Sequence, residues 1–395
     1  MRKQTKAVRT QTKKTHYREH STPLFLTSSF SFESAEQGKA LFEETEQGNL
    51  YSRFSNPTVQ EFIDKVCILE DCEDGVATAT GMAAVFASMA ALLKSGDHIL
   101  ACRALFGSAH QIITQILSKW NITYTYLDAT ATAAEWEAAV QPNTRMIYLE
   151  TPSNPGLDLV DLEMIGKICK QHNLIFNVDN CFASPALQNP VAYGADLVLH
   201  SATKFMDGQG RVLGGIVVGK KEYIKELRFF CRQTGPSMSP FNAWVLSKSL
   251  ETLELRMEKH CSNALKLATA LDNHPDVKQV KYPFLESHPQ HALAKKQMRG
   301  GGAIVTIELD GGFERVSGFM KALEIATLSS NLGDTRTIVT NPYTTTHAKL
   351  KEEEKLALGI TEGLIRISVG LEHVDDLIED FTNAVEVSVK SDILE

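Results

Sequence analysis

Two residues that could do chemistry each follow a short, mainly apolar run. Lys204 comes after the run 197–200, together with the hydroxyl residues Ser201 and Thr203, and Asp179 comes after the run 174–178. Partial removal from water lowers the pKa of a lysine and makes it a nucleophilic amine, whereas a carboxylate in such a place needs a cation or an N–H group as partner. A solvated surface lysine and a helix-capping or salt-bridged aspartate are the ordinary alternatives.

A third feature is the pair Gly81 and Met82, which follows the run 76–80 where a helix is expected to begin. Backbone N–H groups at a helix start can bind a phosphate, and a tight turn between strand and helix is the alternative. The sequence here matches neither G-x-x-x-x-G-K-[ST] nor G-x-G-x-x-G, so it indicates neither a nucleoside triphosphate nor a dinucleotide.

The loop TPSNP at 151–155 follows another apolar run, and its two prolines fix the backbone around the amide of Asn154. Alone, this loop is a turn. Taken together, these features form the set that pyridoxal phosphate requires. Lys204 offers an amine, Asp179 an anion for the pyridine nitrogen, and the N–H and hydroxyl groups offer donors to the phosphate.

The elements that must position these residues alternate along the chain. Strands are expected at 76–80, 98–101, 124–127, 146–150, 174–178, 197–200 and 215–218, and helices at 59–69, 82–93, 107–119 and 160–172. Such apolar runs between helices are typical of strands buried on both faces of a mostly parallel sheet, so the fold class is α/β. Ligands bind at the carboxyl ends of such strands.

After about residue 245 the pattern changes. A long amphipathic helix that starts near Ala243 leads to three glycines at 300–302 and then to strands at 303–309 and 365–369, which predicts a smaller α+β domain. The expected organisation has three parts: an arm over 1–52, basic and flexible up to residue 20; a large α/β domain over 53–247; and the smaller C-terminal domain over 248–395.

The composition is that of an ordinary folded protein. A net charge of −8 argues against nucleic acid and anionic membranes as partners, and the longest uncharged stretch, 75–93, is too weakly hydrophobic to span a bilayer. Seven scattered cysteines without a C-x-x-C pair favour a reducing compartment, so a cytoplasmic location is expected, with a transit peptide in the basic segment 1–20 as the alternative. The twelve histidines show no metal-ligand spacing, so no metal site is expected.

Six motifs resemble, in order and spacing, the Cys/Met-metabolism family of pyridoxal-phosphate enzymes. They are YSRFSNPT (51–58), TGMAA (80–84), ETPSNP (150–155), NVDN (177–180), SATKF (201–205) and IRISVG (365–370). The resemblance runs from about residue 20 to about residue 380. This family includes cystathionine γ-synthase, cystathionine and methionine γ-lyases and homoserine-ester sulfhydrylases. The resemblance implies the aminotransferase-like fold of pyridoxal-phosphate enzymes, fold type I.

The resemblance also implies roles at the cofactor. Lys204 would carry the cofactor covalently and be the catalytic residue, Asp179 would keep the pyridine nitrogen protonated, and Asn154 would contact the ring hydroxyl oxygen. The phosphate would be held by Ser201, Thr203, Gly81 and Met82.

Further roles concern the substrate and a neighbouring subunit. Arg366 would grip the α-carboxylate of an amino-acid substrate, a bidentate task suited to guanidinium. Tyr51 and Arg53 would reach the phosphate of a neighbouring subunit, so the active site would need at least a dimer, usually within a homotetramer.

Departures from the family pattern narrow the expected reaction. Phe106 stands where many members have a tyrosine; it can stack on the cofactor ring but cannot exchange protons. Together with the NLGDTR segment at 331–336, this favours γ-replacement on O-succinylhomoserine with sulfide, giving homocysteine and succinate for methionine biosynthesis. The effect of Asn341, found where His is usual, is unassigned, and His110 is either in the site or an ordinary helix-surface histidine.

Several alternatives stay open. Within the family they are cystathionine γ-synthase, which uses cysteine, O-acetylhomoserine sulfhydrylase, and the cystathionine or methionine γ-lyases. From another class, a cofactor-free binding protein or a nicotinamide enzyme would explain the α/β pattern but not Asp179 together with Lys204.

Overall fold

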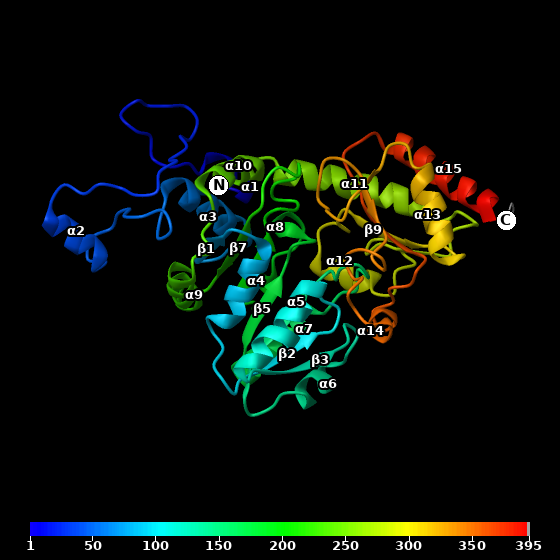
Figure 1. Ribbon diagram of the computed structural model, residues 1–395, viewed down its shortest axis with the longest axis horizontal. Helices are drawn as coiled ribbons and strands as arrows, with labels where there is room; N and C mark the ends of the chain where they lie inside the picture. Colours follow the sequence, from blue (N-terminus) through cyan, green and yellow to red (C-terminus); the bar gives the residue numbers. More distant parts are fainter. Residues whose placement is uncertain (393–395) are drawn as a thin grey trace.

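Two β-sheets organise residues 1–392, the part of the chain that this computed structural model describes (Figure 1). The first sheet has the order β1-β7-β6-β5-β4-β2-β3. Strand β7 runs antiparallel to both of its neighbours, and all other neighbouring pairs are parallel, as expected for a mostly parallel sheet. The strands are β1 (Asp74–Thr78), β2 (His98–Cys102), β3 (Thr123–Leu127), β4 (Thr144–Glu150), β5 (Ile175–Asp179), β6 (Leu197–Ser201) and β7 (Gly215–Gly219).

Both faces of this sheet are buried, which explains why its strands are continuous apolar runs. In β4, Ile147 and Leu149 pack into a core with helices α3 (Pro57–Glu70), α7 (Leu162–His172) and α10 (Pro240–Leu250). Met146 and Tyr148 of the same strand pack into a second core with α4 (Gly81–Ala90) and α9 (Lys221–Thr234) on the other face. Side chains alternate along a strand, so a strand covered on both sides carries apolar residues at every position.

The second sheet has the order β10-β11-β12-β9-β8 and is antiparallel except for the pair β10 and β11. Ile365 and Ile367 of β12 lie in a core formed with helices of this domain. Arg366 lies between them and therefore faces the other side of the sheet. The elements are β8 (Gln279–Lys281), β9 (Ile304–Glu308), β10 (Thr327–Leu328), β11 (Ile338–Thr340), β12 (Leu364–Ser368), α11 (Leu253–Asp272), α13 (Gly312–Ala322) and α15 (Val374–Asp392).

Two expected helices differ in detail. The segment 107–119 is α5 (Gly107–Gln111) followed by a π-helical turn at 112–116 and a 3-10 turn at 117–120. The long helix near Ala243 is two helices, α10 and α11. The buried Arg256 guanidinium lies beside this break and donates to the carbonyl oxygen of Ser249, near the end of α10, at 3.1 Å and to that of Phe205 at 2.7 Å. Short helices complete the fold: α6 (Ala133–Ala138), α8 (Ser184–Leu187), α12 (His291–Gln297) and α14 (Glu352–Ala357).

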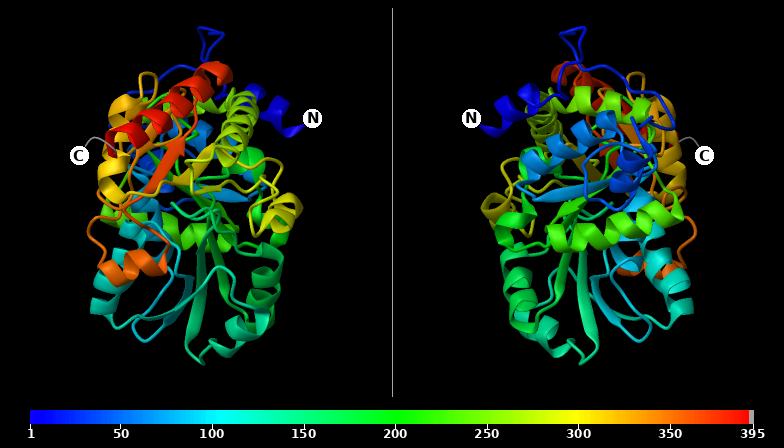
Figure 2. Two further views of the ribbon diagram at one scale, coloured as in Figure 1. Left: turned by 90° about the vertical axis from the view of Figure 1, so that its right-hand side faces the viewer. Right: turned by 90° about the vertical axis from the view of Figure 1, so that its left-hand side faces the viewer.

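The N-terminal segment contains a helix that the sequence did not predict. Residues 3–9 form α1 (Lys3–Arg9), which packs against α3 and buries Ala7. Lys3 Nζ bonds the carbonyl oxygen of Leu69 at 3.0 Å and pairs with Asp71 at 2.5 Å, so this part of the arm is held by its own chain. Farther along, α2 (Ala35–Phe42) lies away from the body of the molecule (Figure 1). Figure 2 shows α1 in dark blue and the C-terminal helix α15 in red, both at the upper end of the molecule. The domain limits at residues 52 and 247 stay an interpretation.

Among residues 1–392, no helix combines the length and apolar character that crossing a membrane requires.

Candidate active site

A cavity of about 450 Å³ opens at the carboxyl ends of the first sheet, where loops of the second domain also line it. Most of the site residues predicted from sequence line this cavity; Tyr51 and Arg53 do not. The predicted residues that line it are Gly81, Met82, Phe106, Asn154, Asp179, Ser201, Thr203, Lys204 and Arg366. The carboxyl ends of parallel strands meet at one edge of the sheet, which explains how residues from distant motifs converge.

Lys204 is partly buried in the turn after β6. Its Nζ donates a hydrogen bond to Oδ1 of Asn331 at 2.6 Å. Burial is the largest effect on Lys204 and lowers its pKa, and the charge of the nearby Arg366 guanidinium also lowers it. Both effects favour the neutral, nucleophilic amine that the sequence predicts. Asn331 was recognised from sequence only as a departure from the family pattern; nothing in the sequence places it beside Lys204.

Asp179 ends β5 and has the N–H partner that its position requires. The backbone N–H of Cys181 donates to Oδ1 of Asp179 at 3.0 Å. Burial raises the pKa of Asp179 to about 6, and the Cys181 N–H and His200 lower it in part. Cys181 lines the same cavity, and its thiol donates to the carbonyl oxygen of Ser201 at 3.6 Å. Burial raises the pKa of this thiol, so it stays protonated.

Glu150 is a buried carboxyl of the cavity to which the sequence analysis assigned no role. It ends β4 and lies directly opposite Asp179 in the strand register. Its Oε2 accepts a hydrogen bond from the backbone N–H of Phe106 at 2.7 Å. Burial, followed by the charge of Asp179, raises the pKa of Glu150 well above its ordinary value. The rule that selected Asp179, a carboxylate at the end of a buried strand, would also have found Glu150.

The start of α4 fits the phosphate of a cofactor. Thr80 caps the helix by accepting from Ala83 N at 3.1 Å, whereas the N–H groups of Gly81 and Met82 lie in the first turn, where no intrahelical acceptor exists. A Cβ atom at Gly81 would lie 2.5 Å from the Cβ of Ser201, so only glycine lets the helix approach the serine hydroxyl. The Thr203 hydroxyl lines the same cavity and accepts from Gly214 N at 3.0 Å.

Arg366 reaches the cavity from β12 and touches the loop that carries Asn154. Its Nη1 donates to Oδ1 of Asn154 at 3.1 Å, and its Nη2 donates to the carbonyl oxygens of Ser330 and Asn331, each at 3.0 Å. Its Nε is buried and has no partner among the described atoms. Burial lowers the pKa of Arg366 to about 10, so the group keeps its charge at neutral pH. A buried cation with an unfilled donor fits a carboxylate ligand.

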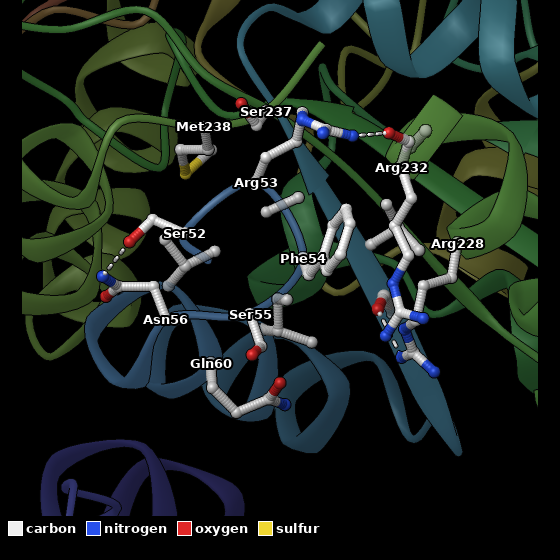
Figure 3. Close-up of a pocket in the computed structure, with 16 residues that line it drawn as sticks. Ser52, Arg53, Phe54, Ser55, Asn56, Gln60, Arg228, Arg232, Ser237 and Met238 are labelled. Carbon is white, nitrogen blue, oxygen red and sulfur yellow. Dashed lines mark hydrogen bonds between the residues drawn. The ribbon is translucent and has the colours of Figure 1, made fainter. Parts of the chain in front are cut away.

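Tyr51 and Arg53 do not line this cavity. Arg53 lies in a separate depression, where it donates to the carbonyl oxygen of Arg232 and its guanidinium lies 4.8 Å from the ring centre of Phe54 (Figure 3). Tyr51 is 43% exposed. Within one chain, neither residue reaches the groups around Lys204.

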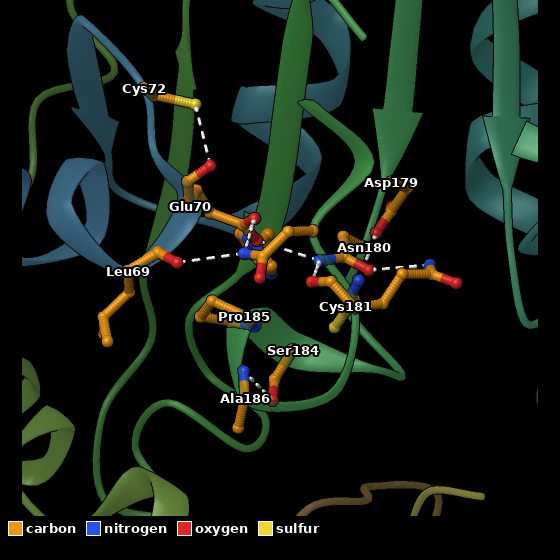
Figure 4. A network of polar contacts seen from close by, with 12 residues as sticks. Leu69, Glu70, Cys72, Asp179, Asn180, Cys181, Ser184, Pro185 and Ala186 are labelled. Atoms are coloured by element: carbon orange, nitrogen blue, oxygen red, sulfur yellow. Dashed lines mark hydrogen bonds and ion pairs between the residues drawn. The ribbon is translucent and has the colours of Figure 1, made fainter. Parts of the chain in front are cut away.

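A buried polar network lies beside Asp179 and fixes the neighbouring strand end (Figure 4). The carboxylate of Glu70, at the end of α3, accepts from Nδ2 of Asn180 at 2.8 Å and from Nδ2 of Asn189 at 3.1 Å. His200 of β6 lies 2.6 Å from the same carboxylate through its Nε2. Because each of these groups is buried and satisfied, the network holds the ends of β5 and β6 in register.

The structure shows the positions of two residues, His110 and Asn341, whose roles the sequence analysis left unassigned. His110 does not line the cavity; its ring stacks on Tyr126 with centroids 5.5 Å apart, and its Nε2 lies 3.9 Å from Glu354. Asn341 fastens the loop before Thr346, a cavity residue, because its Nδ2 donates to the carbonyl oxygens of Glu362 and Leu364 at 2.9 and 2.8 Å. Within the described residues, no group of three metal-binding side chains occurs.

Comparison with known proteins agrees with this geometry. The sequence profile of the Cys/Met metabolism PLP-dependent enzymes matches residues 4–386. The chain is 44% identical over 381 residues to an O-succinylhomoserine sulfhydrylase of Pseudomonas aeruginosa, covering 96% of this chain and 94% of the relative. It is 40% identical over 385 residues to an L-methionine gamma-lyase of Fusobacterium nucleatum subsp. polymorphum, with 97% of each chain covered.

Among solved structures, a Campylobacter jejuni protein that contains N'-pyridoxyl-lysine-5'-monophosphate aligns with a TM-score of 0.93 at 32% identity, covering 98% of this chain and 100% of that one. The fold and the cavity together define a pyridoxal-phosphate enzyme of fold type I. More narrowly, the chain belongs to the Cys/Met metabolism family of PLP-dependent enzymes.

Proposed function

We propose that this enzyme catalyses γ-replacement on O-succinylhomoserine with sulfide, giving homocysteine and succinate. The observation that carries the proposal is Phe106, a cavity residue without a proton to donate. Succinate leaves as a stable carboxylate and needs no proton, whereas a thiol leaving group in a γ-lyase needs an acid. Among the described residues that line the cavity there is no tyrosine and no histidine. The 44% identity to an O-succinylhomoserine sulfhydrylase also supports this reaction.

In this proposal Lys204 is the catalytic residue. Pyridoxal phosphate, when bound, supplies an electron sink that stabilises negative charge on the carbon that loses a proton. The Lys204 amine, whose pKa burial lowers, takes a proton from Cα of the bound amino acid, releases it, and then takes a second proton from Cβ, so that succinate can leave Cγ as a carboxylate. After sulfide has added at Cγ, the amine returns protons to the carbon atoms that lost them. Arg366 binds the α-carboxylate and thereby orients the Cα–H bond toward Lys204.

The remaining residues would hold the cofactor. Asp179 would pair with the pyridine nitrogen, Asn154 would contact the ring hydroxyl oxygen, and Phe106 would stack on the ring. The N–H groups of Gly81 and Met82 and the hydroxyls of Ser201 and Thr203 would bind the phosphate.

Tyr51 and Arg53 complete the phosphate site from a neighbouring subunit of a homotetramer, which we place in the cytoplasm. The separation of Arg53 from the cavity of its own chain supports an assignment to a second subunit. This assignment predicts that a dimer is the smallest active species.

Methionine γ-elimination is the second candidate, favoured by the 40% identity to L-methionine gamma-lyases. Two further family reactions, with cysteine in place of sulfide or with O-acetylhomoserine in place of the succinyl ester, use the same groups at Cα and Cβ. These reactions differ from the proposed one in the leaving group or in the nucleophile.

The test is a comparison of kcat/KM across substrates. O-succinylhomoserine is offered with sulfide and with cysteine in parallel, O-acetylhomoserine with sulfide, and L-methionine alone. The proposal expects the highest value for the succinyl ester with sulfide. A higher value with cysteine would make the enzyme a cystathionine γ-synthase, and rapid release of methanethiol from methionine would make it a γ-lyase; either result contradicts the proposal.

A further inference from the structure

We propose that Asn331 is a positioning residue for Lys204: its side-chain oxygen holds the lysine amine and stabilises the protonated form whenever the amine is not bonded to the cofactor. This inference rests on the proposed role of Lys204. It assigns a task to one of the residues by which this chain departs from many of its relatives.

The contact is short and direct. Lys204 Nζ donates to Oδ1 of Asn331 at 2.6 Å, and both residues line the cavity. The two residues belong to different domains, since Lys204 follows β6 of the first sheet and Asn331 precedes β11 of the second. The hydrogen bond therefore joins the catalytic lysine to the domain that also supplies Arg366.

Asn331 is itself fixed from several sides. Its carbonyl oxygen accepts from Nη2 of Arg366 at 3.0 Å, and its N–H donates to Oγ of Ser329 at 3.3 Å. Two residues later, Gly333 has φ +79, and a Cβ there would lie 2.7 Å from the backbone N of Phe205 and 2.9 Å from the carbonyl carbon of Lys204. The loop therefore packs directly on the backbone of the lysine, so the acceptor oxygen is already in place when the amine becomes available.

The charges around Lys204 show why an acceptor matters. Burial favours the neutral amine, and the charge of Arg366 acts in the same direction. The other ionisable groups that line the cavity are the carboxyls Asp179 and Glu150. An amide oxygen accepts a stronger hydrogen bond from an ammonium than from a neutral amine. Asn331 thus opposes burial and Arg366 and keeps Lys204 able to return a proton as well as to take one.

The test measures the titration of Lys204 in the cofactor-free enzyme. Reductive methylation with isotope-labelled formaldehyde modifies only neutral amines, and mass spectrometry of the peptide that contains Lys204 gives its extent at each pH. Wild type is compared with Asn331→Ala, which removes the acceptor, and with Asn331→Asp, which replaces it with an anion. Ser329→Ala is the matched control, because it loosens the same loop without removing the oxygen.

For Asn331→Ala, we expect the midpoint of the Lys204 titration about one pH unit below the wild-type midpoint. For Asn331→Asp we expect a midpoint above the wild-type value, and for Ser329→Ala an unchanged one. Equal midpoints for wild type, Asn331→Ala and Asn331→Asp would overturn the inference. If Asn331→Ala does not fold, the direction of the Asn331→Asp shift decides: an upward shift supports the inference and no shift overturns it.

A separate measurement distinguishes failure of the proposed function. Borohydride reduction of the cofactor-loaded enzyme, followed by peptide mapping, shows which lysine carries the pyridoxyl group. If another lysine carries it, the proposed role of Lys204 is wrong. If Lys204 carries it and the midpoints do not move, only the role of Asn331 is wrong.

Discussion

Nη1 of Arg366 donates a hydrogen bond to Oδ1 of Asn154 at 3.1 Å, across the boundary between the two sheets. Arg366 lies on β12 and Asn154 on the loop after β4, so this bond joins the proposed α-carboxylate site to the proposed cofactor site. Thr306, the register partner of Arg366 on β9, makes a second bond to the same loop by donating to the carbonyl oxygen of Pro155 at 2.8 Å. The position of the arginine is therefore fixed before any substrate binds.

Replacing Arg366 with lysine is expected to raise KM for the amino-acid substrate about 100-fold or more, with a smaller effect on kcat. A single ammonium cannot bond Asn154, Ser330 and a carboxylate in one plane, and truncating one partner of a buried charged hydrogen-bond pair costs about 2–5 kcal/mol. Steady-state kinetics check this. The control is Arg336→Lys, which changes an exposed arginine paired with Asp334 and is expected to leave KM within about twofold; an unchanged KM in Arg366→Lys would exclude the assigned role.

Lys204→Ala is expected to abolish turnover, with a loss of at least about 10³-fold, and to remove the visible absorbance of the covalently held cofactor. Both effects follow if Lys204 supplies the amine for cofactor and proton transfer alike. Absorbance spectra and the sulfide assay measure them on the same sample. Lys220→Ala, which removes an exposed lysine at the end of β7 paired with Asp196, serves as control. Survival of either signal in Lys204→Ala would contradict the assignment.

Gly333→Ala is expected to lower the free energy of unfolding by about 1–3 kcal/mol and to weaken cofactor binding. The residue has φ +79, and the added Cβ meets backbone atoms of Lys204 and Phe205, which cannot move aside as a flexible side chain could. Gly235→Ala is the matched control, since Gly235 has φ +85 with nothing within 4 Å of the added atom. Thermal unfolding and cofactor titration should show the larger loss in Gly333→Ala; equal losses would mean that only the backbone angle matters.

Most of the first domain could be predicted from sequence because its signals are local. A strand buried on both faces carries apolar residues at every position, as the run 146–149 does, and the residue that follows such a strand lies at the ligand-binding edge. Element ends were off by a few residues. The break between α10 and α11 was not predicted, because the sequence from Ala243 to Asp272 contains no glycine or proline that would mark it.

The site could be predicted only as far as motifs define it. Lys204, Asp179 and Arg366 come from three separate motifs, and the structure places them around one cavity. The bond between Lys204 and Asn331 links residues 127 positions apart in different domains, and no periodicity encodes such a contact. The role of Tyr51 and Arg53 at a neighbouring subunit stays a prediction, because their own chain brings neither residue to the cavity around Lys204.

Asp179→Asn is expected to stabilise the cofactor-free enzyme above pH 6 and to weaken cofactor binding. The folded-state pKa of Asp179 is raised from 3.8 to about 6, so between these values the folded state binds more protons than the unfolded state and stability falls as pH rises. Ionisation of the buried Asp179 therefore lowers the free energy of unfolding by about 1–3 kcal/mol above pH 6, and it has no such effect below pH 3.8. Melting temperatures at pH 8 and pH 4 measure it, with the exposed Asp128→Asn as control. If Asp179→Asn raises the melting temperature at both pH values, or at neither, the raised pKa of Asp179 is contradicted.

Phe106→Tyr is expected to shift the enzyme from γ-replacement toward γ-elimination. Phe106 lines the cavity, and its backbone is fixed by the 2.7 Å bond from its N–H to Glu150, so a tyrosine would keep the ring position and add a phenolic proton donor. General acid catalysis contributes about 10²–10⁴-fold when the leaving group needs a proton. Methanethiol release from L-methionine should therefore rise at least about tenfold. Homocysteine formation from O-succinylhomoserine and sulfide should change much less, because a carboxylate departs unaided. Phe106→Leu, which removes the ring without adding a donor, should lower both activities. An equal rise of both reactions in Phe106→Tyr would show that the residue at this position does not choose between leaving groups.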